Sequence, residues 1–295
     1  MYLGRMALLI SVLVLGGCTE QEQPAPLGVT YVANDGFLIE CADKKILIDA
    51  LFDNFESDWC FVPPDSVVDL MVRAQSPFDD IDIIAVTHAH VDHFNAKSVI
   101  DHLRHNRSGI LVCPPEVAQA LAGSAYYEEI RDRIRAVCPP PDSAVTMTIA
   151  GVTIKARRTA HGPYYEEDQS TGVSVDRHRN VQHLEYLFSV AGRVVYHSGD
   201  AGMHDLLKYT AYGYGADSID LAFVQWWSAG EMLTFRQKLV RDVIHPERVI
   251  LMHLSPRKKL GGHPEQQPVA KEVIVPQYPM QGWVFRARPG AAEGE

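Results

Sequence analysis

The segment His88-Ala89-His90-Val91-Asp92-His93 places three imidazoles and one carboxylate within six residues. It directly follows the apolar run 82–87, which predicts a buried strand. Alternate residues of a strand face the same side, so the first two histidines are expected to point together, and a turn would carry the aspartate and the third histidine to a second position. Imidazole nitrogens and carboxylate oxygens suit Zn²⁺ and similar divalent ions. The spacing predicts a metal centre that could hold two ions; the alternative is a histidine-rich turn satisfied by hydrogen bonds and solvent.

Three more residues of metal-ligand type stand where later predicted strands end. His161 and Asp200 each follow such a strand, and His253 ends another. Strand ends that gather at one edge of a sheet bring side chains together on a rigid scaffold. These three residues are therefore expected to complete the metal centre.

Hydrophobic patterning predicts strand pairs and strand–helix units in both halves of the chain. Strands are expected at residues 29–33, 36–40, 45–49, 82–87, 110–113, 145–149, 152–159, 184–190, 193–197, 221–225 and 249–253. Helices are expected at residues 65–75, 96–106, from 115 onward, 203–212 and 232–243. This order predicts an α/β fold in which two sheets pack face to face with helices outside, a four-layer αββα sandwich.

With these residues in this order, the chain resembles the metallo-β-lactamase-fold hydrolase superfamily from its first strands to His253. The resemblance implies that Asp49, at the end of a strand, supports the metal ligands through hydrogen bonds. It also implies hydrolysis by a hydroxide bound to a dinuclear zinc centre, with Mn or Fe as alternatives to Zn. The ligands implied for one ion are His88, His90 and His161, those for the other are Asp92, His93 and His253, and Asp200 would bridge the two ions.

The resemblance also narrows the substrate. A carboxylate at the position of Asp200 is typical of phosphodiesterases, lactonases and thioesterases, whereas true β-lactamases generally lack it. Residues 181–188 look most like the lactonase and N-acyl-phosphatidylethanolamine phospholipase D-like branch. A phosphodiester or a lactone is therefore the expected substrate, as a small molecule or a lipid. The alternatives are a thioesterase or amidohydrolase with the same site, and a non-catalytic metal-binding protein of the cell envelope.

Two residues are candidates for direct catalytic roles. Asp92 is expected to orient the nucleophile or relay a proton. His183, at the start of a predicted strand, is a candidate acid or hydrogen-bond donor, and a structural histidine is an equal alternative. The segment from Tyr164 to Arg179 is long enough to form a lid or a pocket wall.

Composition and charge limit the possible partners and the number of domains. The 295 residues carry a formal net charge of −10 and no long lysine or arginine run, which excludes a nucleic-acid partner. No linker divides the region 28–285, which is expected to form one hydrolase domain, followed by a flexible tail at 286–295.

The N-terminus has the layout of a bacterial export signal. Arg5 precedes an apolar stretch that is too short to span a bilayer, and Leu15-Gly16-Gly17-Cys18 resembles a lipobox. Residues 1–17 are thus expected to be removed, Cys18 to be lipidated and residues 18–27 to form a tether. Thr19 favours the periplasmic face of the outer membrane, with the lipid anchor as the contact to the membrane. An ordinary cleaved signal with an incidental cysteine is the alternative.

Four more cysteines would then lie in a compartment that permits disulfides. Cys113 and Cys138 end similar phrases and are the favoured pair, with Cys41 and Cys60 as the complementary pair. Four free thiols remain the alternative, because the sequence does not give the Cα separations that a bridge requires.

Overall fold

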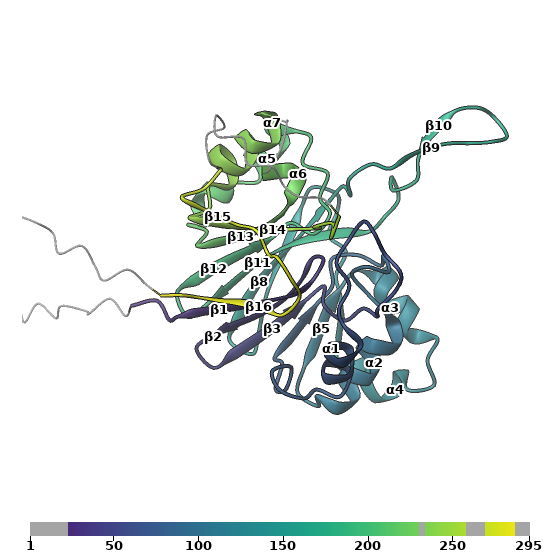
Figure 1. The fold of residues 1–295 in the computed structure, drawn as a ribbon, viewed down its shortest axis with the longest axis vertical. Helices are drawn as coiled ribbons and strands as arrows, with labels where there is room; N and C mark the ends of the chain where they lie inside the picture. The colour runs from purple at the N-terminus through teal and green to yellow at the C-terminus, as the bar shows by residue number, and fades with distance from the viewer. Residues whose placement is uncertain (1–22, 230–233, 258–268, 287–295) are drawn as a thin grey trace, which may run out of the picture.

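Two mixed seven-stranded sheets and a separate two-stranded hairpin form the framework of the computed structural model, which describes residues 23–229, 234–257 and 269–286 (Figure 1). The first sheet has the order β16-β1-β2-β3-β4-β5-β6. Its strands are β1 (Leu27–Ala33), β2 (Gly36–Cys41), β3 (Lys44–Ile48), β4 (Ile83–Ala85), β5 (Ile110–Cys113), β6 (Ile134–Ala136) and β16 (Gln281–Phe285). The strands from β16 to β3 pair antiparallel, and those from β3 to β6 pair parallel.

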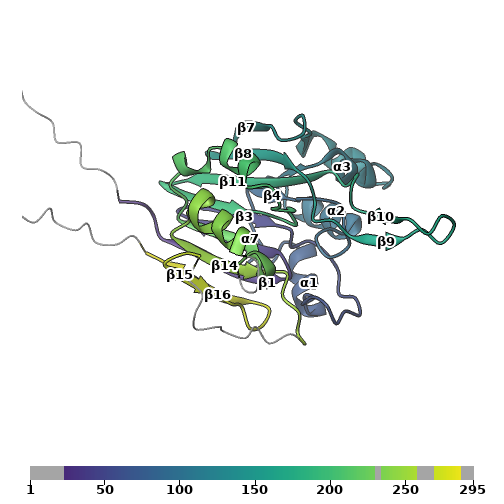
Figure 2. The same cartoon turned by 90° about the horizontal axis from the view of Figure 1, so that it is seen from above.

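The second sheet has the order β15-β14-β13-β12-β11-β8-β7. Its strands are β7 (Ala144–Ile149), β8 (Val152–Thr159), β11 (His183–Val190), β12 (Arg193–His197), β13 (Leu221–Gln225), β14 (Arg248–Met252) and β15 (Glu272–Ile274). The remaining pair, β9 (Tyr165–Glu167) and β10 (Ser174–Asp176), forms a hairpin that extends away from both sheets (Figures 1 and 2).

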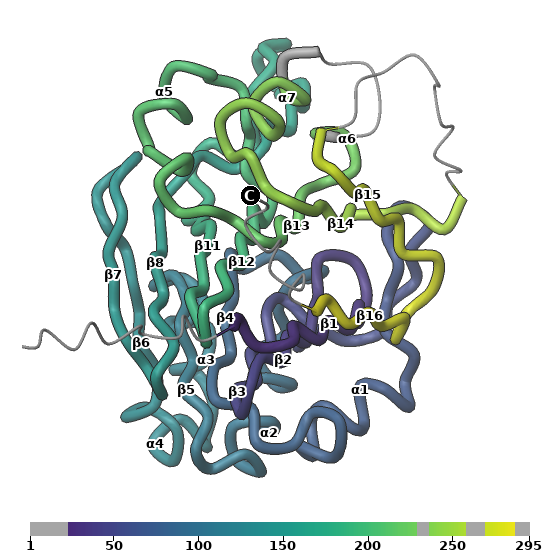
Figure 3. The backbone as a smooth tube through the Cα atoms, turned by 90° about the vertical axis from the view of Figure 1, so that its left-hand side faces the viewer, coloured from purple at the N-terminus to yellow at the C-terminus, as the bar shows by residue number. Residues whose placement is uncertain are grey.

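Helices cover the outer face of each sheet, so that the molecule has four layers (Figure 3). The first sheet carries α1 (Asp65–Val72), α2 (Ala96–His105), α3 (Pro115–Ala122), α4 (Tyr127–Ile130) and the short helix η1 (Arg131–Arg133). The second half of the chain has α5 (Leu206–Ala211), η2 (Tyr214–Ala216), α6 (Trp226–Ala229), α7 (Thr234–Lys238) and the π-helix η3 (Leu239–Ile244). The predicted αββα sandwich is therefore confirmed.

Alternate side chains of strand β2 point to opposite faces of the sheet, which explains why the layers stack in this way. Phe37 and Ile39 point into the core between the two sheets, whereas Leu38 points into the core beneath α1 and α2. Both faces of the strand are buried, which suits its nearly continuous apolar sequence. Phe37 stacks on Phe223 of the opposite sheet with ring centroids 4.0 Å apart, and this contact ties the halves of the chain together.

Several strands end at one edge of the sandwich. Parallel pairing places the ends of β3 and β4 side by side in the first sheet and those of β12, β13 and β14 side by side in the second. Strand β8 runs in the same direction as β12, because both pair antiparallel with β11. The loops that follow these strands carry the predicted metal ligands.

Some predicted boundaries differ from the structure. Strand β4 ends at Ala85 rather than at residue 87, because the backbone N–H of Thr87 donates to the Asp49 carboxylate instead of continuing a ladder. The helix expected at 203–212 is limited to α5, and that expected at 232–243 is α7 followed by η3, with residues 230–233 outside the described region.

The predicted Cys113–Cys138 disulfide is wrong. The described cysteines, Cys41, Cys60, Cys113 and Cys138, are all free thiols. Cys113 is buried in the core beneath the helices, whereas Cys138 lies beyond the end of β6 and is exposed, so their side chains occupy different environments. The complementary Cys41–Cys60 pair is likewise absent.

The predicted signal, Cys18 and the first half of the tether lie outside the described residues. Within the part of the chain that the structure describes, no helix is both long and apolar enough to cross a bilayer.

Candidate metal centre

Three histidines form the first cluster at the strand-end edge. His88 and His90 come from the loop after β4, and His161 comes from the loop after β8. The His88 Nε2 atom lies 3.0 Å from His90 Nδ1 and 3.3 Å from His161 Nε2. Two donors that each lie about 2.1 Å from one ion are roughly 3–4 Å apart, so these separations match a shared ion. The three residues can hold one metal ion.

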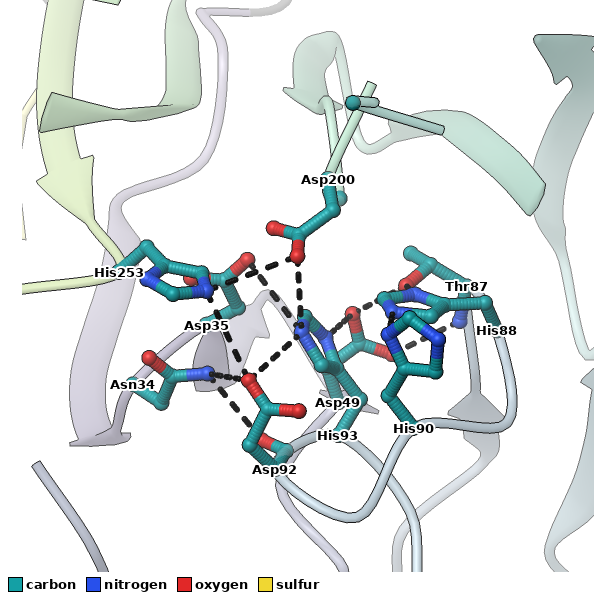
Figure 4. A network of polar contacts seen from close by, with 12 residues as sticks. Asn34, Asp35, Asp49, Thr87, His88, His90, Asp92, His93, Asp200 and His253 are labelled. Carbon is teal, nitrogen blue, oxygen red and sulfur yellow. Dashed lines mark hydrogen bonds and ion pairs between the residues drawn. The ribbon is translucent and has the colours of Figure 1, made fainter. Parts of the chain in front are cut away.

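The second cluster consists of Asp92, His93 and His253 (Figure 4). His93 Nε2 lies 3.3 Å from Asp92 Oδ2, and His253 Nε2 lies 3.6 Å from the same oxygen. His253 follows β14 with a φ of 56°, and its backbone N–H donates to the carbonyl of Asn34 in the turn after β1 of the first sheet (3.3 Å). These three residues can hold a second ion.

Asp200 joins the two clusters. Its Oδ2 atom lies 3.4 Å from His161 Nε2 in the first cluster. The same atom lies 3.6 Å from His93 Nε2 and 3.5 Å from His253 Nε2 in the second. One carboxylate oxygen is thus as close to the histidines of both clusters as two ligands of one metal ion are to each other. The structure therefore brings together all seven residues predicted as ligands.

Asp49 determines how two of the histidines are oriented. Its carboxylate accepts hydrogen bonds from the backbone N–H of Thr87 (2.8 Å), the hydroxyl of Thr87 (2.6 Å) and Nδ1 of His93 (2.9 Å). Because the Thr87 hydroxyl donates to Asp49, its oxygen accepts from Nδ1 of His88 at 2.9 Å. Both imidazoles then carry a proton on Nδ1, which leaves Nε2 of each ring as the nitrogen that can bind a metal ion in the centre. Asp49 thus lies where the supporting aspartate was predicted.

Two residues that the sequence did not single out also reach the centre. Asn34 and Asp35 form the turn between β1 and β2 and are both fully buried. The Asn34 side-chain amide donates to Asp92 Oδ2 (2.9 Å) and to the Asp92 carbonyl (3.2 Å). Asp35 Oδ2 lies 3.9 Å from His93 Nε2. In the sequence this dipeptide indicates only a turn between two predicted strands, because asparagine and aspartate favour turns regardless of any ligand role.

A buried histidine links this turn to the loop that carries Asp200. His197 Nε2 donates to the Asp35 carbonyl (2.9 Å), and the backbone N–H of Gly199 donates to His197 Nδ1 (3.0 Å). Gly199 has a φ of +48°, and a Cβ atom there would lie 2.6 Å from His183 Nε2 and 2.8 Å from Thr87 Cβ. The loop therefore requires glycine immediately before Asp200.

His183 lies behind the ligands. It is fully buried, and its Nδ1 atom lies 2.9 Å from the hydroxyl of Thr159. Its ring centroid is 5.5 Å from that of His88 and 5.7 Å from that of His161. This packed position favours a structural role for His183 over a role as catalytic acid or donor.

His178, which the sequence placed only within the predicted lid or pocket wall, lies at the base of the hairpin. Its ring centroid is 4.3 Å from His161 and 4.8 Å from His90. Its Nδ1 donates to the Gly162 carbonyl (3.0 Å), which also accepts from His161 Nδ1 (2.7 Å). The segment predicted as a pocket wall thus contacts the first cluster at its base.

Aromatic side chains flank the second cluster. The ring of Trp227 lies 4.9 Å from that of His253, and the ring of Trp59 lies 5.7 Å from it. Trp59 is 45% exposed. On the other side, Tyr164 is 54% exposed and packs against His178 with a centroid distance of 5.5 Å. Aromatic side chains therefore lie beside both clusters.

Electrostatics distinguish the two clusters. In the first, burial and neighbouring imidazoles lower the pKa of His90 to about 4 and that of His88 well below its usual value, so both rings are neutral ligands at pH 7. In the second, burial opposes protonation of His253, yet the Asp200, Asp35 and Asp92 carboxylates raise its pKa to about 9. The second cluster is thus a region of strong negative potential.

The donor set fits divalent metal ions. Four carboxylates are buried together, with exposed fractions of 0% for Asp35, 1% for Asp49, 4% for Asp92 and 6% for Asp200. Over the described ranges, their ion pairs are with histidines and none is with lysine or arginine. Buried charges need counter-charges. His93 Nε2 and Asp200 Oδ1 are buried without a hydrogen-bond partner in the described part of the chain, as expected of atoms that face a cation.

Comparison with known proteins agrees with this geometry. A UPF0173 metal-dependent hydrolase of Methanosarcina mazei is 24% identical over 253 residues, which cover 85% of this chain and 93% of that protein. Igni18, a novel metallo hydrolase from Ignicoccus hospitalis, superposes with a TM-score of 0.53 at 16% identity, covering 88% of this chain and 99% of its own. CmlA, a diiron β-hydroxylase from Streptomyces venezuelae, gives a TM-score of 0.52 at 13% identity, covering 89% of this chain and 54% of its own. Residues 44–259 match the family model of the beta-lactamase superfamily domain, and the chain therefore belongs to the beta-lactamase superfamily.

Proposed function

We propose that this protein is a metal-dependent hydrolase that uses two divalent ions, with Zn²⁺ as the first candidate and Mn or Fe as alternatives. The observation that carries the proposal is the position of Asp200 Oδ2, 3.4 Å from His161 Nε2 and 3.5 Å from His253 Nε2. A carboxylate placed in this way can bridge two ions. When bound, such a pair would polarise a carbonyl or phosphoryl oxygen and lower the pKa of an attacking water toward neutrality.

The chain's own residues prepare the centre for this reaction. Asp49 and Thr87 hold the tautomers of His88 and His93, and the Asn34 amide fixes the orientation of Asp92. A fixed carboxylate at the edge of the reaction site can orient a nucleophile and accept its proton. We assign this role to Asp92, whose pKa is held low by His93 despite the opposing effect of burial.

The proposed substrate is a phosphodiester or a lactone. Both present a compact electrophilic group that carries attached apolar parts, and Trp59, Trp227 and Tyr164 supply apolar surface on either side of the centre. The resemblance noted from the sequence supports the same substrate classes through the Asp200 position.

A location at the cell envelope forms part of the proposal. The lipobox-like segment before Cys18 supports export and lipid attachment, and a lipid substrate would then lie close to the enzyme. Membrane fractionation of a Cys18→Ser variant tests this location, with release of the protein from the membrane fraction as the expected result. If the variant fractionates with the membrane as the unchanged chain does, lipid attachment at Cys18 is excluded.

Metal analysis and a substrate panel on one preparation test the function. Elemental mass spectrometry is expected to find about two divalent ions per chain. Hydrolysis of a phosphodiester or a lactone should exceed that of a thioester, an amide and a β-lactam, and His90→Ala should abolish it. Preferred hydrolysis of the thioester or amide would instead support the thioesterase or amidohydrolase alternative. Bound metal without turnover on any of these substrates would support the non-catalytic envelope protein.

A further inference from the structure

Asp35 is a buried carboxylate that the ligand set described above does not use. It is 0% exposed, and neither of its side-chain oxygens has a hydrogen-bond partner among the described residues. Figure 4 shows it beside His93 and His253, on the side of the second cluster opposite Asp92. We propose that Asp35 is an additional ligand of the metal ion in the second cluster, an inference that rests on the proposed metal centre.

The contact between Asp35 and His93 places a buried carboxylate beside a nitrogen that can bind a metal ion. His93 donates its Nδ1 proton to Asp49 at 2.9 Å, so its Nε2 atom presents a lone pair when the ring is neutral, as it must be to bind a metal ion. Asp35 Oδ2 faces that lone pair at 3.9 Å, which is too long for a hydrogen bond and within the separation expected of two ligands on one ion. Two electron-rich atoms that face each other in a buried site are stabilised by a positive charge between them.

The backbone around Asp35 is held in place by the centre itself. The Asn34 amide bonds to Asp92, and the Asp35 carbonyl accepts from His197. A Cβ atom at Gly36 would lie 2.9 Å from the Asp49 carbonyl oxygen and 2.9 Å from the Ala50 Cα, so the turn packs directly on the strand end that carries Asp49. Asp35 is therefore positioned by a rigid turn, as a preorganised ligand should be.

An additional carboxylate makes the two metal sites chemically unequal. The first cluster offers three imidazoles, whereas the second would offer two imidazoles and the carboxylates of Asp35 and Asp92, with Asp200 shared. Oxygen-rich sites suit harder ions, and imidazole-rich sites suit Zn²⁺. We expect the second site to bind Mn²⁺ more favourably, relative to Zn²⁺, than the first site does.

The test compares the full chain with Asp35→Asn, which keeps the shape of the side chain and removes its charge. Glu185→Gln serves as the control, because Glu185 is also fully buried but lies outside the centre, bonded to Tyr196 and paired with Arg157. Each protein is stripped with chelator and titrated with Mn²⁺ and with Zn²⁺ by calorimetry, and thermal unfolding is measured with and without metal.

The unchanged chain and the Glu185→Gln control should bind two ions. Asp35→Asn should bind one ion with unchanged affinity and the second at least tenfold more weakly, with a larger loss for Mn²⁺ than for Zn²⁺. The metal-free variant should unfold no lower in temperature than the metal-free parent, because asparagine keeps the shape of the side chain and the Asp35 oxygens have no hydrogen-bond partner among the described residues to lose.

The alternative outcomes are distinguishable. Two ions bound by Asp35→Asn as tightly as by the parent would overturn the role of Asp35 and leave the proposed function standing. A variant that is destabilised equally with and without metal, and that binds metal normally once folded, would make Asp35 structural. If the unchanged chain binds no metal, the metal centre fails and the role of Asp35 fails with it.

Discussion

The Asp49 carboxylate accepts the Nδ1 proton of His93 at 2.9 Å, and through Thr87 it also fixes the tautomer of His88. One buried carboxylate therefore orients a metal ligand in each cluster. His88 belongs to the imidazole-rich cluster and His93 to the carboxylate-rich one. The two predicted metal sites share a hydrogen-bond support as well as the bridging Asp200.

Replacement of Asp49 should weaken the binding of both ions. In Asp49→Asn the side-chain oxygen can accept from only part of this network, and the new amide donates toward Thr87 or His93, which already donate. We expect metal affinity to fall about 10- to 100-fold, the range typical for residues that orient metal ligands. Calorimetric titration with Zn²⁺ measures the change. The matched control is Asp43→Asn, whose side chain is 80% exposed. Equal affinities in Asp49→Asn and the control would exclude the orienting role.

Metal binding should release protons at neutral pH. In the metal-free protein the surrounding carboxylates raise the pKa of His253 from 6.5 to about 9, so its ring is protonated at pH 7 and must lose that proton to bind a metal ion. Calorimetry at pH 7.5 in buffers of different ionisation enthalpy should show at least one proton released when the second site fills, and metal affinity should rise up to about pH 9. A proton count of zero would contradict the elevated pKa.

The raised pKa of His253 also predicts how the stability of the metal-free protein depends on pH. Because the folded-state pKa of His253 is raised, its stabilising effect is fully present below about pH 6.5 and is lost as the pH rises through about 9. The free energy of unfolding of chelator-treated protein should therefore decrease between pH 7 and pH 9.5. Denaturant titrations at several pH values measure the decrease, and His253→Gln should show a smaller one.

The sequence predicted the metal ligands because few residue types bind metals and because those types stand at strand ends. His161, Asp200 and His253 follow β8, β12 and β14, and the strand directions required by the fold bring these ends to one edge. The hydrophobic pattern placed most of the strands for the same reason, since each strand is buried in a sheet between packed layers.

Asp35 and His178 could not be recognised in this way. Asp35 stands in a dipeptide that any tight turn favours, and its proximity to His93 depends on how the first sheet packs against the loop after β4. His178 returns to the centre only through the β9–β10 hairpin. Strand β16 was also missed, because its pairing with β1 joins segments that are far apart in the sequence and no local pattern specifies that register.

The cysteines show how similar local sequences can have different surroundings. Cys113 is buried, and burial raises its pKa to about 12, whereas Cys138 is exposed. In a Cys18→Ser variant of the full chain, a thiol reagent should modify Cys138 alone under native conditions and should modify three further thiols after unfolding in denaturant without reductant. Mass spectrometry of the modified peptides identifies the sites. Fewer than four reactive thiols in the unfolded protein would reveal a disulfide that the structure lacks.

Gly199 should be among the least replaceable residues of the chain. Its left-handed conformation opposes any side chain, and an added Cβ atom would also lie 2.6 Å from His183 Nε2 and 2.8 Å from Thr87 Cβ. Gly199→Ala therefore combines backbone strain with overpacking and should lower the free energy of unfolding by about 2–4 kcal/mol. Gly213→Ala separates the two effects, because Gly213 has a φ of +73° and no atom of the described residues lies within 4 Å of an added Cβ. Backbone strain alone should cost about 1 kcal/mol there. Denaturant unfolding of both variants gives the comparison. Metal titration of Gly199→Ala should show weaker binding, because displacement of Thr87 moves the group that bonds to His88, and because Gly199 directly precedes Asp200. Equal decreases in the free energy of unfolding for the two substitutions would mean that the loop before Asp200 can shift to accept a side chain without disturbing the centre.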